Sequence, residues 1–87
     1  MNFEVGKAYV GTATVDREHQ KVFVVLARCG RRVSLAEVKG VHREKVVVVG
    51  DREFVTIKSA DGFDYGVAAS VAVDIDAAFN VVGMCNG

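Results

Sequence analysis

Residues 42–53 read HREKVVVVGDRE, and this stretch decides the fold class of the chain. The valine run Val46 to Val49 is too short for a helix, and β-branched side chains pack well on a pleated sheet. Gly50-Asp51 is a turn dipeptide, and Glu53 to Lys58 follows as a second extended segment. The stretch therefore predicts a strand, a two-residue turn and a second strand, which together form a β-hairpin.

Alternation within the second strand of this hairpin predicts its two faces. Successive strand residues point to opposite faces, so Phe54 and Thr56 share one face and the other face carries Glu53, Val55 and Ile57. Ser59 to Gly62 then supplies a further turn.

Three more extended segments are predicted before the hairpin. Lys7–Val15 alternates loosely, and the charged stretch Asp16–Gln20 turns the chain into the apolar run Val22–Leu26, which we expect to be a central strand. Cys29–Arg32 offers a tight turn. A third strand follows it, with Val33, Leu35 and Val38 alternating with polar residues until Lys39-Gly40 ends it.

The C-terminal third supports two interpretations. Val71–Ile75 alternates as a strand would, and we expect a turn near Asp76–Ala78 and a final strand over Phe79–Val82. The alternative is a short helix over residues 67–79, because apolar residues there also fall at helical spacing: Val67, Val71, Ile75 and Ala78.

Five to seven short strands without long helices predict an all-β, mainly antiparallel fold. We expect a small SH3-like or partly open β-barrel, with one short C-terminal helix as a variant. Residues 1–87 suit a single domain, because a chain this short cannot support two cores. Such barrels host many unrelated functions, so the fold alone predicts none.

Composition narrows the class of protein. The chain is 51% hydrophobic and 25% charged, which excludes a disordered protein, and it has no apolar run long enough to cross a bilayer. The N-terminus lacks the pattern of a signal peptide, so we expect a cytoplasmic protein. Cys29 and Cys85 are interpreted as reduced, small apolar side chains, and a disulfide between them is the alternative.

The charge of the chain is balanced overall but unevenly distributed. Residues 28–58 carry eight basic and four acidic side chains, whereas residues 59–87 carry four acidic and no basic ones. If the turn at Gly30 and the hairpin at Gly50 project from the same end of the barrel, the basic middle forms a positive patch able to meet phosphates or an acidic protein surface. The acidic end offers the opposite hypothesis, carboxylates presented to a basic groove. The candidate partner-binding residues are therefore Arg31, Arg32, Arg43, Arg52, Asp74 and Asp76.

No group of residues predicts catalysis or a bound metal. The soft metal ligands of the chain are His19, His42, Cys29 and Cys85, and they do not have the spacing of structural zinc sites. The two histidines are expected in polar, exposed turns. Asp74 and Asp76 share one face of a strand, but paired carboxylates need a cleft and separated pKa values before they work as an acid and a base. We expect no metal, no cofactor and no enzymatic activity.

Arg-Glu pairs occur three times, as Arg17-Glu18, Arg43-Glu44 and Arg52-Glu53. Their spacing follows no repeat period, and each lies beside a hydrophobic strand. Charges there keep apolar strands from pairing with other molecules, so we interpret the pairs as gatekeepers. Cross-strand pairing of Arg43 or Arg52 with Glu44 or Glu53 would fix the register of the hairpin.

Four short segments carry a resemblance to known proteins: TATVD (Thr12–Asp16), VFVVLAR (Val22–Arg28), RRVSL (Arg31–Leu35) and REFV (Arg52–Val55). In this order they resemble small, mostly uncharacterised β-rich proteins encoded by phages and mobile elements of Gram-positive gut bacteria. The resemblance ends after Val55, and no functional residue is carried over from it. It implies an accessory protein that binds and inhibits a bacterial defence complex, as anti-CRISPR proteins do.

We therefore expect a small, non-catalytic protein that binds a macromolecular partner, with a protein as the first choice. The alternative is a nucleic-acid-binding module that uses the basic hairpins, which steep weakening of binding with salt would reveal. A valine-rich sheet with an exposed edge also pairs readily with its copy, so we expect a homodimer rather than a monomer.

Overall fold

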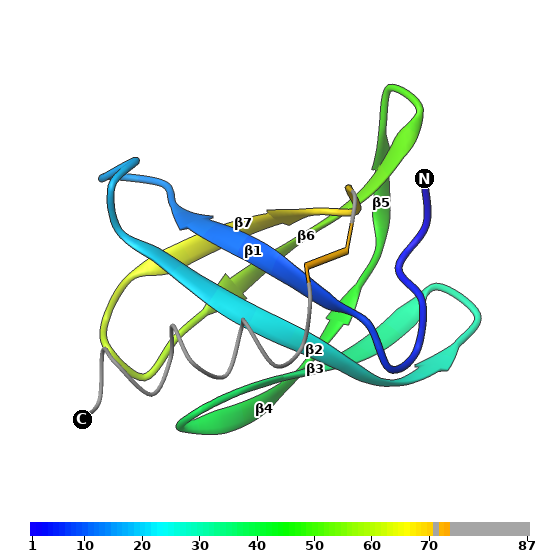
Figure 1. Ribbon diagram of the computed structural model, residues 1–87, viewed down its shortest axis with the longest axis horizontal. Helices are drawn as coiled ribbons and strands as arrows, with labels where there is room; N and C mark the ends of the chain where they lie inside the picture. The colour runs from blue at the N-terminus through cyan, green and yellow to red at the C-terminus, as the bar shows by residue number, and fades with distance from the viewer. Residues whose placement is uncertain (71, 74–87) are drawn as a thin grey trace.

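The structure is a computed structural model that describes residues 1–70, 72 and 73 (Figure 1). The described residues form an antiparallel sheet of seven strands in the order β4-β3-β2-β1-β7-β6-β5, curled into a half-barrel. This confirms the predicted all-β fold and partly open barrel. The strands are β1 (Ala8–Ala13), β2 (Gln20–Cys29), β3 (Arg32–Glu37), β4 (Gly40–Lys45), β5 (Val47–Val49), β6 (Arg52–Lys58) and β7 (Asp64–Ala68).

The two edge strands of the sheet, β4 and β5, are consecutive in the chain. Only Val46 separates them, and this residue is buried and donates its backbone N–H to the carbonyl oxygen of Arg31 at 2.6 Å. The chain thus leaves one edge of the sheet at Val46 and joins the other edge directly. Because of this connection, the twisted sheet curls back on itself.

Two glycines let aromatic rings pack directly on the curled sheet. A Cβ atom on Gly11 would lie 2.5 Å from the ring of Phe23, and one on Gly66 would lie 2.8 Å from the ring of Phe54. A side chain at either position would force the neighbouring ring to move. Glycine within a strand commonly marks such a close approach.

The core lies inside the curl and follows the two-residue period of the strands. Fully buried large side chains come from the N-terminal segment and from every strand except β4 and β5, and they include Phe3, Tyr9, Phe23, Leu35, Ile57 and Tyr65. Each contributes about 1.5–3 kcal/mol through burial of apolar surface. The alternation in β6 confirms the predicted faces, with Glu53, Val55 and Ile57 buried.

The hairpin at Gly50-Asp51 is confirmed. Val49 pairs with Arg52 across the two-residue turn, and Gly50 has a φ of 66°, a left-handed conformation that glycine adopts without strain. The strands before it were also correctly placed, with one exception. Val38 lies in the turn after β3 and is 59% exposed, so its predicted place within the third strand was wrong.

The sequence pattern did not indicate strands β4 and β7. In β4 the exposed and half-buried residues alternate, but the sequence GVHREK has no apolar stripe, because this edge strand faces solvent along one side. In β7 the sequence DYGVA has a glycine at its centre, which weakens the strand pattern.

The predictions for the C-terminal third fall mostly outside the described residues. The turn at Asp76–Ala78 and the strand over Phe79–Val82 lie outside the described residues. The alternative helix over residues 67–79 is wrong at its start, because Val67 and Ala68 belong to strand β7, and the rest of it lies mostly outside the described residues. Val73 is described, and its backbone N–H donates to the carbonyl oxygen of Ala8 at 2.9 Å in an isolated antiparallel bridge. Cys29 is exposed, and Cys85 lies outside the described residues. In the described part of the chain, no helix is long and apolar enough to cross a membrane.

Candidate protein-binding edge

The β5–β6 hairpin extends beyond the body of the half-barrel (Figure 1). Val47, Val48 and Val49 are 51%, 71% and 57% exposed. Since neighbouring residues of a strand point to opposite faces, these values mean that neither face of β5 is covered. A strand made only of exposed valines is unusual on a protein surface and marks a candidate interaction site.

The backbone of β5 also has an open side. Val48 pairs with Glu53 in the register of the two strands. The Glu53 N–H donates to the Met1 carbonyl oxygen at 3.0 Å, and the Glu53 carbonyl oxygen accepts from the Ala69 N–H at 2.8 Å. Both backbone groups of Glu53 therefore point away from β5, which makes Val48–Glu53 a non-hydrogen-bonded pair.

This pairing determines where the backbone groups of Val48 point. In a non-hydrogen-bonded pair, the N–H and C=O groups of both residues point outward. Since β5 is the last strand of the sheet, the N–H and C=O of Val48 face the open side. Among the described residues, this edge offers one donor and one acceptor between exposed valine side chains, which are the features that an added strand uses.

The predicted basic residues are exposed but lie on different elements. Arg31 and Arg32 lie at the turn into β3, Arg43 is on the edge strand β4, and Arg52 begins β6. The β2–β3 turn and the β5–β6 turn leave the barrel in different directions (Figure 1), so the geometric condition for one patch is not met. Asp74 and Asp76 lie outside the described residues.

The N-terminal segment runs between these two turns. The Met1 amino group donates to the Asp51 carbonyl oxygen at 2.6 Å, and the Gly6 N–H donates to the Val25 carbonyl oxygen at 2.8 Å. The segment thus connects the tip of the hairpin to β2. It supports β6 from the side opposite to β5, and within the described residues no strand pairs with the outer side of β5.

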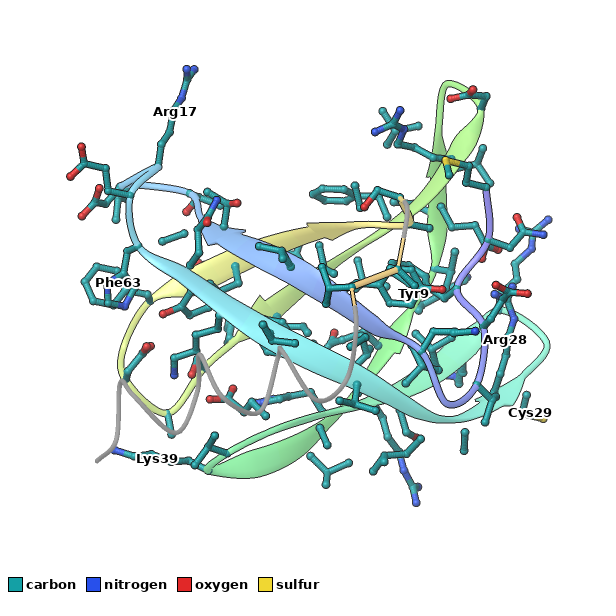
Figure 2. All side chains as sticks on the ribbon, in the orientation of Figure 1. Tyr9, Arg17, Arg28, Cys29, Lys39 and Phe63 are labelled. Atoms are coloured by element: carbon teal, nitrogen blue, oxygen red, sulfur yellow. The ribbon has the colours of Figure 1, made fainter. Side chains whose placement is uncertain are left out.

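An ion pair between Arg28 and Glu53 anchors the base of the hairpin. Nη2 of Arg28 donates to Oε2 of Glu53 at 2.6 Å, Nη1 donates to Oε1, and the Phe3 N–H donates to Oε1 at 2.9 Å. The hydrogen bonds from Arg28 lower the pKa of Glu53 below its ordinary value. Figure 2 shows Arg28 beside the N-terminal segment. Next to it, a shallow depression of about 590 Å³ is lined by Met1, Asn2, Phe3, Glu4, Arg28 and Ser70.

This ion pair corrects the interpretation of the Arg-Glu pairs. Glu53 is 8% exposed and bonds to Arg28, so it is not a gatekeeper at the surface. The predicted cross-strand pairing of Arg43 or Arg52 with Glu44 or Glu53 is also wrong, because Arg43 and Glu44 belong to β4, which pairs with β3. Of the three pairs, Arg17-Glu18 is fully exposed, and Figure 2 shows Arg17 extending away from the barrel.

A second polar cluster, here called the Lys21 cluster, lies where β2, β3 and the β6–β7 loop meet. Nζ of Lys21 lies 2.9 Å from Oε1 of Glu37, 2.9 Å from Oδ2 of Asp61 and 3.1 Å from Oγ of Ser59. The Tyr65 hydroxyl donates to the same Asp61 oxygen at 2.5 Å. One lysine therefore bridges two carboxylates at the rim of the core.

The prediction of exposed turn histidines is wrong for His42 and holds for His19, whose side chain is 42% exposed. His42 lies in strand β4 with its side chain 18% exposed, and its Nε2 is 2.7 Å from Oε2 of Glu37. His19 does lie in a turn, but its ring packs on Phe63 with centroids 4.5 Å apart. Both histidines extend the Lys21 cluster.

The pKa shifts in this cluster favour a structural role. Burial raises the pKa of Glu37, but hydrogen bonds from Lys21, His42 and Ser59 outweigh it and lower the pKa overall. Burial lowers the pKa of Lys21, but the hydrogen bonds to Asp61 and Glu37 outweigh burial, so the pKa is raised overall. The acid and the base thus move away from neutrality, whereas general acid–base catalysis needs groups that titrate near the working pH.

Within the described residues, the donor and acceptor groups of both clusters are engaged. No buried side-chain nitrogen or oxygen there lacks a hydrogen-bond partner, and no three His, Cys, Asp or Glu side chains form a metal-binding group.

Comparison with known proteins adds no functional assignment. No protein-family model matches the chain, and neither the curated proteins nor the solved structures gave a match. The candidate site therefore rests on the geometry of the chain itself.

The two polar clusters were missed although the sequence carried a signal for each. Glu53 was placed on the same face as Val55 and Ile57, and an acid on a core face requires a cationic partner. Lys21 lies two residues before Phe23 and Glu37 two residues after Leu35, so the same two-residue period directs both toward the core.

Proposed function

We propose that this chain is a non-catalytic protein-binding module that takes up an extended strand of a protein partner along the open edge of β5. One observation carries the proposal: the N–H and C=O of Val48 face outward from the last strand of the sheet. The exposed valines on both sides of this residue supply apolar surface for the side chains of the added strand. Strand addition is a common mode of peptide recognition, in which backbone hydrogen bonds give affinity and neighbouring side chains give specificity.

The aromatic side chains support a protein partner over a nucleic acid. Single-strand binders stack bases on exposed aromatic rings between cations. In this chain Tyr9 and Tyr65 are buried, Phe54 packs over Gly66, and Phe63 packs against His19. The exposed arginines are therefore left without an aromatic platform in the described residues.

The resemblance to phage and mobile-element proteins suggests a narrower identity. If it holds, the partner is a component of a bacterial defence complex, and the chain inhibits that complex by pairing β5 with one of the strands of that component. This narrower identity rests on the resemblance alone, and the proposed binding edge does not depend on it.

Site-specific photo-crosslinking in the cells that carry the protein tests the proposal. A photoreactive amino acid is placed at Val49, and in a control at Val15, which is 78% exposed and lies outside the strands. We expect a discrete protein adduct from position 49 and none from position 15. We also expect Val48→Pro to abolish the adduct at position 49, because proline removes the outward N–H. Equal adducts from both positions, or an adduct that survives Val48→Pro, would overturn the proposal.

A further inference from the structure

The open edge of β5 is suited to pair with itself. Val48 contributes one outward donor and one outward acceptor at the middle of a three-residue strand. Two antiparallel copies related by a two-fold axis at this residue would exchange both bonds, with each N–H donating to the carbonyl oxygen of the other Val48. A two-fold axis is the commonest symmetry of protein dimers. Taking the proposed function as given, we infer that the strand taken up along β5 is β5 of a second copy of this chain.

The structure excludes the neighbouring registers. A shift by two residues would place Val48 opposite Val46 or Gly50. The N–H of Val46 is already donated to the Arg31 carbonyl oxygen, and Gly50 lies in the turn with a positive φ. The register with Val48 opposite Val48 is therefore the one that the edge of β5 allows.

Charges beside the valines are complementary in this register. With Val48 on the axis, Lys45, the last residue of β4, approaches the Gly50-Asp51 turn of the other copy, and both Lys45 and Asp51 are exposed. The segment KVVVVGD, which runs from the residue before Val46 to the end of the turn, thus has opposite charges at its two ends, equally distant from Val48. Such an arrangement favours pairing of the segment with its own copy and fixes the register.

The exposed valines also match in this register. Val47 lies opposite Val49 of the other copy on one face, and the two Val48 side chains meet on the other face. Cross-strand pairs of β-branched residues stabilise a sheet. The contact is short, at the small end of specific interfaces, so we expect a dissociation constant on the order of 10–100 µM.

Sedimentation equilibrium from about 5 µM to 1 mM tests the inference. The wild-type chain should pass from the monomer mass of 9.3 kDa toward twice that mass. Val48→Pro should stay monomeric while its circular dichroism spectrum keeps the wild-type form, since the lost N–H serves no bond within the sheet. Val48→Lys, which places two like charges on the axis, should also stay monomeric. Val41→Lys, at a 59% exposed valine of the other edge strand, is the matched control and should dimerise normally.

A charge exchange tests the register itself. Lys45→Asp and Asp51→Lys should each weaken the dimer about tenfold, because each creates two like-charge pairs. An equimolar mixture of these two variants contains two attractive pairs in the mixed dimer, so its association should return to the wild-type level.

Three results would overturn the inference: a wild-type chain that stays at the monomer mass at 1 mM, a Val48→Pro variant that still dimerises, or a variant mixture that does not recover. If the wild-type chain is monomeric but position 49 crosslinks to another protein, strand addition at β5 stands and only the identity of the partner is wrong.

Discussion

The ion pair between Arg28 and Glu53 yields the prediction with the clearest magnitude. Removal of one member of a fully buried pair costs about 3–5 kcal/mol, because a charge is left without compensation. The Glu53 side chain is 11% exposed, but that of Arg28 is 26% exposed. Water therefore reaches the freed carboxylate in Arg28→Ala, and we expect a loss of about 2–3 kcal/mol in the free energy of unfolding.

A double-mutant cycle separates the ion pair from the packing of its side chains. Glu53→Gln should cost about 1–2 kcal/mol, because the side chain keeps its size and an acceptor oxygen while it loses its charge. In that background Arg28→Ala should cost less than in the wild type, with a coupling of about 1–2 kcal/mol. Urea unfolding followed by circular dichroism measures all four proteins at pH 7. Arg32→Ala, at an exposed arginine on the neighbouring strand, is the control and should change stability by less than about 0.5 kcal/mol.

The same pair predicts a pH dependence. Its hydrogen bonds lower the pKa of Glu53 in the folded chain below the ordinary value of 4.5. A carboxylate of this kind contributes stability above its ordinary pKa and loses the contribution as the pH falls through the lowered folded-state value. The stability difference between the wild type and Glu53→Gln should therefore be largest near neutrality and shrink below about pH 4.5. An Arg28→Ala cost below about 1 kcal/mol, or a difference that is the same at pH 7 and pH 3, would refute the reasoning.

Two further predictions concern the rest of the fold. Lys21→Met should destabilise the chain by about 2–4 kcal/mol at pH 7, because Glu37 and Asp61 lose their shared cation. The pKa values of both carboxyl groups are lowered in the folded chain, so urea unfolding should show a smaller cost at pH 3, below their ordinary values of 4.5 and 3.8; an equal cost at pH 7 and pH 3 would contradict the cluster's role. Gly66→Ala should cost about 1–3 kcal/mol, because the new methyl group meets the ring of Phe54, whereas Gly40→Ala has open space and should be nearly neutral in the same thermal-unfolding assay.

The hairpin could be predicted from the sequence because its signals are local. A valine run, a Gly-Asp turn and an alternating strand each favour the same structure, so the element and its faces were correct. The closure of the sheet has no such local signal. Val46 looks like the three valines after it, yet it is buried at 4% exposure while Val47 to Val49 are exposed, because the chain changes edges at that residue.

The candidate site was predicted only in part for the same physical reason. The valine run predicted a strand with an exposed edge, which is local information, whereas the charge pattern indicated Arg31, Arg32 and Arg52, which lie outside β5. The open edge at Val48 depends on which strand lies last in the sheet and on the alternation of its hydrogen bonds with β6. Both properties follow from pairings between residues far apart in the sequence, and a single sequence does not specify them.

The most direct test of the proposed binding edge is hydrogen–deuterium exchange of the three β5 amides, measured residue by residue by nuclear magnetic resonance. In dilute protein, the Val47 and Val49 amides should be protected by their bonds to β6, and the Val48 amide should exchange as fast as an exposed loop amide. At high protein concentration, or with a crosslinked partner bound, the Val48 amide should become protected and the other two should change little. A Val48 amide that is already protected in the dilute monomer, or one that stays unprotected when a partner is bound, would contradict strand addition at β5.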